Sequence, residues 1–70
     1  MPQTRADLEI AQRQVEDAER RVLAQKQLVN LMIAQDRDTK EAKELLRQML
    51  TDLDNMRERR DEIAKGFKRY

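Results

Sequence analysis

The closest approach to a metal-binding or ligand-binding motif in this sequence is Asp36-Arg37-Asp38. Carboxylates one residue apart can both reach a hard cation, but aspartates between helices far more often cap helix ends, and we interpret them in that way. Nucleophilic catalysis has no candidate, because the chain contains no cysteine, no histidine and no serine. There is also no glycine-rich phosphate loop. We therefore expect no catalysis, no cofactor and no metal.

The C-terminal quarter is the one locally basic region. From Asn55 to Tyr70, six basic residues face three acidic ones, and Phe67 and Tyr70 lie among them, as in some nucleic-acid-binding segments. However, the backbone dipole also favours basic residues at helix C-termini, and the whole chain is balanced at 15 Lys and Arg against 14 Asp and Glu. Nucleic acid is therefore our second hypothesis, with Arg57, Arg59, Lys65, Lys68 and Arg69 as candidate contacts.

The size of the chain predicts one domain, residues 1–70, with a small core. Below about 70 to 80 residues a single core rarely supplies more than about 3 to 5 kcal/mol. Neither a disulfide nor a zinc site can supplement it without cysteine or histidine, so oligomerisation is expected. No apolar run approaches the roughly 18 residues of a membrane span, and the N-terminus has no signal pattern. We expect a cytoplasmic protein.

Apolar residues recur at alternating spacings of three and four in both halves of the chain, which is the heptad pattern of packed helices. The alternation fails only across Gln35 to Thr39. We predict an all-α fold: a coiled-coil-like antiparallel two-helix hairpin with helices over about 4–35 and 39–65 and a bend at 36–38. One unbroken helix of about 60 residues is the alternative. The predicted seam comprises Leu8, Ala11, Val15, Ala18, Val22, Gln25, Val29 and Met32, then Ala42, Leu46, Met49, Leu53, Met56, Arg60, Ile63 and Phe67.

Polar residues at the predicted ends of the helices supply start and stop signals. Thr4 can cap the first helix, and Asp36 can take the left-handed conformation that usually falls to glycine at a helix C-terminus. Asp38 is expected to cap the second helix, with Glu41 reaching back as in a capping box. Gly66 is the expected C-cap.

Two polar residues occupy seam positions. Gln25 and Arg60 are expected to fix the register of the hairpin, as polar seam residues often do. Arg60 would pair with Glu9 or Glu16 across the hairpin. A grip on an acidic ligand is the less favoured role for Arg60.

A second apolar surface is predicted near the bend, where large apolar residues lie outside the seam. Leu31, about 160 degrees from the seam, cannot reach the other helix of its own chain. Ile10 is the main apolar residue outside the seam in the open half. We predict a homodimer in which two hairpins form a four-helix bundle, acting as a non-catalytic interaction or assembly module. A regulatory ligand of another protein is an alternative. The predicted interface comprises Leu23, Leu28, Leu31, Ile33, Leu45 and Leu50.

One set of residues between positions 19 and 63 forms a pattern that extends over both predicted helices. It comprises Glu19, Arg20, Val22, Gln25, Leu28, Val29, Met32, Asp38, Thr39, Ala42, Leu45, Leu46, Arg60 and Asp61. In this pattern the chain resembles a family of short, functionally uncharacterised helical-hairpin proteins common in alphaproteobacteria. Asp36 stands where that family usually has glycine, and the histidines common in the family are missing here. The resemblance implies a cytoplasmic hairpin without a known activity, in which Gln25, Arg60 and Asp61 belong to the architecture.

Overall fold

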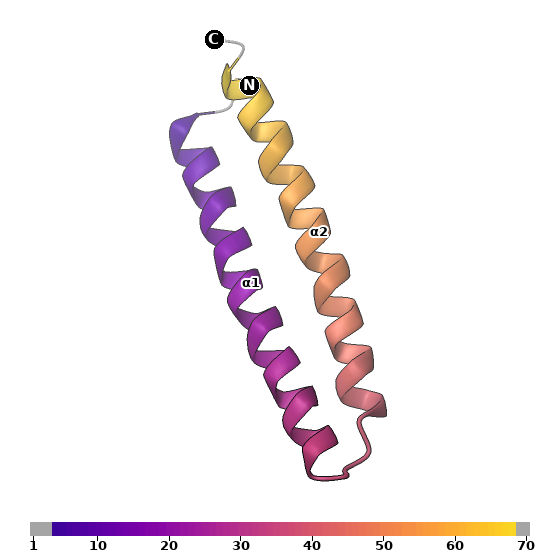
Figure 1. The fold of residues 1–70 in the computed structure, drawn as a ribbon. Coiled ribbons are helices and arrows are strands. Elements are labelled where there is room, and N and C mark those ends of the chain that lie inside the picture. Colours follow the sequence, from indigo (N-terminus) through magenta and orange to yellow (C-terminus); the bar gives the residue numbers. More distant parts are fainter. Residues whose placement is uncertain (1–3, 69–70) are drawn as a thin grey trace.

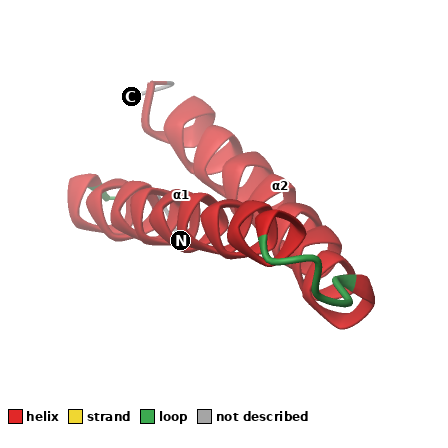
Figure 2. Cartoon of the chain, turned by 60° about the horizontal axis from the view of Figure 1, so that its bottom comes forward, coloured by secondary structure: helices red, strands yellow, loops and turns green. Residues whose placement is uncertain are grey.

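The computed structural model describes residues 4–68, and within them the chain forms two helices and no strand. Helix α1 (Arg5–Ala34) and helix α2 (Lys40–Lys68) lie side by side in opposite directions, joined by a short loop (Figure 1). The predicted antiparallel hairpin is therefore confirmed, and the unbroken helix is excluded. Figure 2, which brings the loop forward, shows that the two helices cross at an angle. Dimerisation does not follow from the structure of one chain.

The chain reverses direction at Asp36, the only non-glycine residue with a positive φ (56°) in the described part of the chain. Two hydrogen bonds close the end of α1 around it. The Arg37 N–H donates to the Met32 carbonyl over 2.9 Å, and the Asp36 N–H donates to the Ile33 carbonyl over 3.0 Å. These are the two bonds of a Schellman motif, with aspartate where glycine is usual. The prediction that Asp36 replaces glycine at this bend is confirmed.

The start of α1 is capped as expected, and more completely. The Asp7 N–H donates to Thr4 Oγ1 (3.2 Å), and the Thr4 N–H donates to Asp7 Oδ2 (3.1 Å), which together form a capping box. The predicted N-cap of α2 at Asp38 is one residue too early. Because α2 begins at Lys40, Thr39 holds the N-cap position, and its carbonyl accepts from the Lys43 N–H (2.8 Å). Asp38 Oδ1 accepts a bond from the Lys40 N–H (3.0 Å), and the expected return bond from Glu41 is absent among the described residues.

The expected cap at Gly66 is wrong. Gly66 lies inside α2, which continues to Lys68, and no glycine in the described chain has a positive φ. The acidic residues at the bend thus define the helix ends there, whereas the single glycine terminates nothing.

The core is the single seam between the helices. Every predicted seam residue whose side chain is described is buried or half-buried, and the Phe67 side chain lies outside the described residues. Val15, at 1% exposure, is the most completely buried, and with Val22 and Leu53 it forms the centre of the core. Half-buried Ala18, Leu46, Met49 and Met56 pack around them. Because the hairpin is a rod of 54 × 14 × 13 Å, the sides of both helices outside this seam face solvent.

Candidate protein-interaction surface

Seven large apolar residues are exposed on the described part of the hairpin, and their exposed fraction runs from 38% of the residue at Leu50 to 58% at Ile10. All six residues of the predicted interface are among them. Ile10 is the seventh, and it lies in the open half as noted from the sequence. The structure therefore places the predicted residues at the surface and in the half near the bend. The exposed set comprises Ile10, Leu23, Leu28, Leu31, Ile33, Leu45 and Leu50.

The exposed leucines lie on two sides of the hairpin rather than one. Leu28 of α1 and Leu45 of α2 line a shallow groove beside the loop, with Met32 and Ala42 between them. We call this the Leu28 side. Because both leucines border the same groove, one from each helix, a partner seated there would contact both helices at once.

Leu23 and Leu50 line a different groove, over the buried Val22 and Leu53. We call this the Leu23 side. Leu23 and Leu28 are five residues apart, which places them about 140 degrees apart around a helix at 100 degrees per residue, and the same holds for Leu45 and Leu50. The two pairs therefore flank the seam on opposite sides, and the structure does not bring all six predicted residues together.

The three remaining exposed apolar residues extend these sides unequally. Ile33 is ten residues from Leu23, about 80 degrees away around α1, and lies with Leu23 on the flank away from Leu28. Leu31 is three residues from Leu28, so it lies about 60 degrees further around α1, on the outer surface. Ile10 lies at the open end on the same side as Leu28, in a groove that it shares with Ile63 and Arg59. The Leu28 side consequently has apolar residues near both ends, with polar residues between them.

The polar seam residues act within the chain. Gln25, a residue only 9% exposed, donates from Nε2 to the Ala42 carbonyl over 2.9 Å and so ties the last third of α1 to the first turn of α2. No buried side-chain polar atom in the described residues lacks a partner. The expected pairing of Arg60 with Glu9 or Glu16 is wrong. Arg60 instead donates from Nε and Nη2 to Oδ1 of its neighbour Asp61, both over 3.2 Å.

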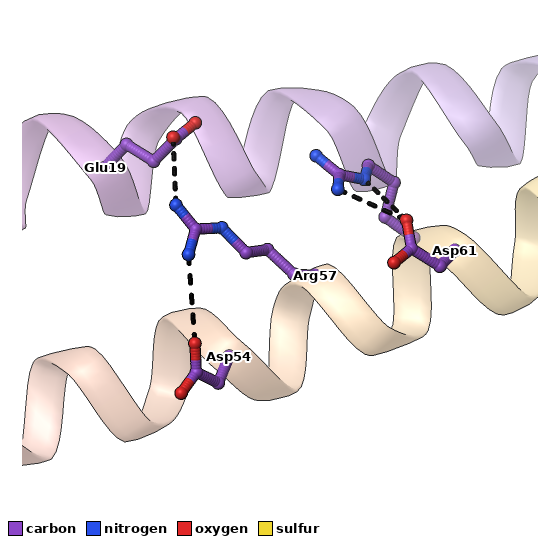
Figure 3. Close-up of polar contacts among 5 residues, drawn as sticks. Glu19, Asp54, Arg57 and Asp61 are labelled. Atoms are coloured by element: carbon purple, nitrogen blue, oxygen red, sulfur yellow. Dashed lines mark hydrogen bonds and ion pairs between the residues drawn. The ribbon is translucent and has the colours of Figure 1, made fainter.

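The ion pair that does cross the seam was not predicted from the sequence. Arg57 Nη2 lies 3.2 Å from Glu19 Oε2 of α1, and its Nη1 lies 3.8 Å from Asp54 Oδ1 of α2 (Figure 3). Arg57 was assigned to a basic end, although its register places it level with Glu19. The heptad positions beside the seam were the signal that could have identified this pair.

The candidate nucleic-acid contacts do not form one surface among the described residues. Arg57 is held between two carboxylates on the Leu23 side. Arg59 is about 200 degrees further around α2 and lines grooves on the Leu28 side instead. Lys65 is exposed, whereas the Lys68 side chain and Arg69 lie outside the described residues.

The titratable groups of the described chain form no candidate metal site. No group of three or more Asp and Glu residues is placed to hold a metal ion. One salt bridge, between the exposed side chains of Glu44 and Arg47, lowers the pKa of the Glu44 carboxyl, first through a hydrogen bond and then through charge attraction. Over the same residues, neither helix has a stretch sufficiently long and apolar to cross a membrane.

Comparisons of the chain with protein-family models, with curated proteins and with solved structures found no match. The resemblance to the alphaproteobacterial hairpins therefore stays a prediction, and the function has to be argued from the surface of the hairpin itself.

Proposed function

We propose that this protein is a non-catalytic assembly module in which two hairpins associate through their apolar surface near the bend to form a four-helix bundle. The observation that carries the proposal is the exposure of Leu28 and Leu45 around one groove beside the loop, with exposed Leu31 about 60 degrees further around α1. Clustered exposed apolar side chains usually mark a protein contact, because leaving them in water forgoes the free energy of their burial.

The thinness of the hairpin supports the same proposal. A seam between two helices buries one stripe of each helix, and only five apolar residues are buried in the described chain: Ala11, Val15, Val22, Val29 and Leu53. Packing a second hairpin against the first would give each helix a second buried stripe, as in four-helix bundles. Self-association would thereby supply core that a 70-residue chain cannot build alone.

The nucleic-acid hypothesis receives less support from the described residues. The guanidinium of Arg57 is already neutralised by Glu19 and Asp54, and Arg59 faces the other side of the hairpin. Backbone phosphates are bound by basic side chains gathered on one surface, which these two arginines do not provide.

Sedimentation equilibrium tests the proposal. The wild type is expected to show twice the 8.4 kDa mass of the chain at high concentration. Leu28→Glu combined with Leu31→Glu is expected to sediment as a monomer with retained helical circular dichroism, because two charges would replace exposed apolar groups at the contact. A wild type that stays monomeric at all concentrations, or a double variant with unchanged mass, would overturn the proposal.

A matched control separates the loss of apolar contact from the added charge. Gln12→Glu with Gln27→Glu adds the same two charges to exposed positions of α1 without changing any apolar residue. This variant is expected to keep the mass of the wild type.

A further inference from the structure

We propose that the second hairpin docks on the Leu28 side with both bends at the same end, so that each α1 packs against the α2 of the other copy. This inference rests on the proposed self-association and specifies its face and its orientation. It follows from the charged residues of α1 and α2 that lie at the same height along the rod, compared for each side of the hairpin.

On the Leu28 side, opposite charges flank the apolar groove. A step of seven residues toward the open end, which is about two helical turns and keeps the same side, leads from Leu28 to Arg21 and from Leu45 to Asp52. The groove that follows along this side is lined by Arg21 and Arg59, which confirms that Arg21 faces it. Both Arg21 and Asp52 are exposed, and neither takes part in an ion pair within the described chain.

A two-fold axis parallel to the rod brings both the leucines and the opposite charges of the Leu28 side into contact. Such an axis keeps every residue at its own level and places α1 of one copy over α2 of the other. Leu28 then faces Leu45 of the second copy, and Arg21 faces Asp52 of the second copy. The symmetry repeats each contact, so the interface contains two apolar pairs and two pairs of opposite charge.

The Leu23 side shows the reverse arrangement. Lys26 lies three residues from Leu23 toward the bend, and Arg47 lies three residues from Leu50 at the same height along the rod. Glu19 lies four residues from Leu23 toward the open end, and Asp54 lies at the same height on α2. Docking through this side would place like charges opposite one another, and Arg57 already occupies the space between the two carboxylates.

The opposite orientation is disfavoured on the Leu28 side as well. Hairpins overlapping along their full length with bends at opposite ends would place Leu28 and Leu45 over the open half of the partner. That half carries Ile10 and Ile63 together with Gln14, Arg59 and Glu62 on this side, so apolar contacts alone do not choose between the two orientations. With the bends at opposite ends, however, each α1 would lie over the α1 of the other copy, and Arg21 would no longer face Asp52. The pairing of Arg21 with Asp52 therefore selects the same-end arrangement.

Charge reversal on the two partner positions tests this geometry. Arg21→Glu alone and Asp52→Arg alone are each expected to weaken self-association by about tenfold, since each creates two like-charge contacts. An equimolar mixture of the two variants restores both opposite-charge contacts in the heterodimer. Its dissociation constant is expected within about threefold of the wild-type value. A mixture that associates no more tightly than the separate variants would overturn the inference.

Two further measurements complete the test. Lys26→Glu, on the Leu23 side, is the matched control and is expected to change the dissociation constant less than about twofold.

Spin labels on Arg5→Cys are expected to lie about 20 to 30 Å apart between the two copies. Bends at opposite ends would separate them by more than the length of α1, about 45 Å at 1.5 Å per residue. A wild type that is monomeric in these experiments defeats the proposed function itself, whereas a dimer with separated labels defeats only the orientation.

Discussion

The two sides of the hairpin carry the same apolar feature in different electrostatic surroundings. Each presents one leucine from each helix beside the seam, Leu28 with Leu45 and Leu23 with Leu50. On the Leu23 side, charges are joined across the seam within the chain through Arg57 and Glu19. On the Leu28 side, Arg21 and Asp52 have no ion-pair partner among the described residues. The exposed leucines alone therefore do not distinguish the two sides of the hairpin. The charged residues of α1 and α2 that lie at the same height beside the leucines do distinguish them.

The comparison suggests a division of roles. Polar contacts on the Leu23 side and in the seam join the two helices of one chain, whereas the Leu28 side is the one that we propose to contact a second copy. Variants that weaken the seam should therefore affect both sides, and variants on one side should affect folding or association separately.

The largest effect is expected at the seam that supports both sides. Leu53→Ala should lower the free energy of unfolding by about 2 to 5 kcal/mol, because Leu53 is buried against Val15 and Val22 and its removal leaves a cavity. Chemical denaturation followed by circular dichroism measures the loss. Leu50→Ala is the matched control. Since Leu50 is 38% exposed, the loss of stability in this variant should be clearly smaller, measured at a protein concentration that fixes the oligomeric state.

A smaller effect is expected at the polar tie within the seam. Gln25→Ala should cost about 1 to 3 kcal/mol, because it removes the hydrogen bond to the Ala42 carbonyl and leaves a gap in the seam. Amide hydrogen exchange should show the main loss of protection in the first turns of α2. Uniform loss along both helices would contradict a local role for Gln25.

The ion pair on the Leu23 side should contribute less. Arg57→Ala should lower the free energy of unfolding by about 0.2 to 1 kcal/mol, since Arg57 and Glu19 are both substantially exposed to solvent. The effect should shrink in 1 M salt, which screens exposed charges. Arg59→Ala, two residues away and without an ion pair among the described residues, should show no such salt-dependent loss of stability.

The smallest effect is expected at Glu44, whose pKa is lowered by Arg47. A carboxyl with a lowered pKa in the folded state stabilises it above the pKa of the unfolded chain, and this contribution is lost as the pH falls. NMR titration should therefore show the Glu44 midpoint rising toward its ordinary value in Arg47→Gln. An unchanged midpoint would show that the salt bridge does not persist in solution.

Much of the fold followed from the sequence because its signals are local. The three-and-four spacing identified the seam, and the break from Gln35 to Thr39 located the bend. Asp36 could be assigned a left-handed conformation because a helix C-terminus needs one and no glycine was near. Gly66 was misassigned because a glycine near a chain end resembles a cap, although a helix can continue through it at a modest cost.

The exposure of the surface residues was predicted correctly but their arrangement was not, and the reason is geometric. Exposure of the six predicted interface residues followed from their positions outside the seam. Their division between two sides required the position of each residue around the helix relative to the neighbouring helix, which spacing along the chain does not show directly. The same limit explains Arg60 and Arg57. Both lie near the seam, and only the packed register shows which guanidinium reaches α1.

One measurement tests the difference between the two sides most directly: sedimentation equilibrium of Leu28→Glu with Leu45→Glu beside Leu23→Glu with Leu50→Glu. Both variants place two carboxylates on exposed positions of one side, one on each helix. We predict that the first variant is monomeric and that the second keeps the dimeric mass of the wild type. A monomeric second variant combined with a dimeric first variant would contradict the account.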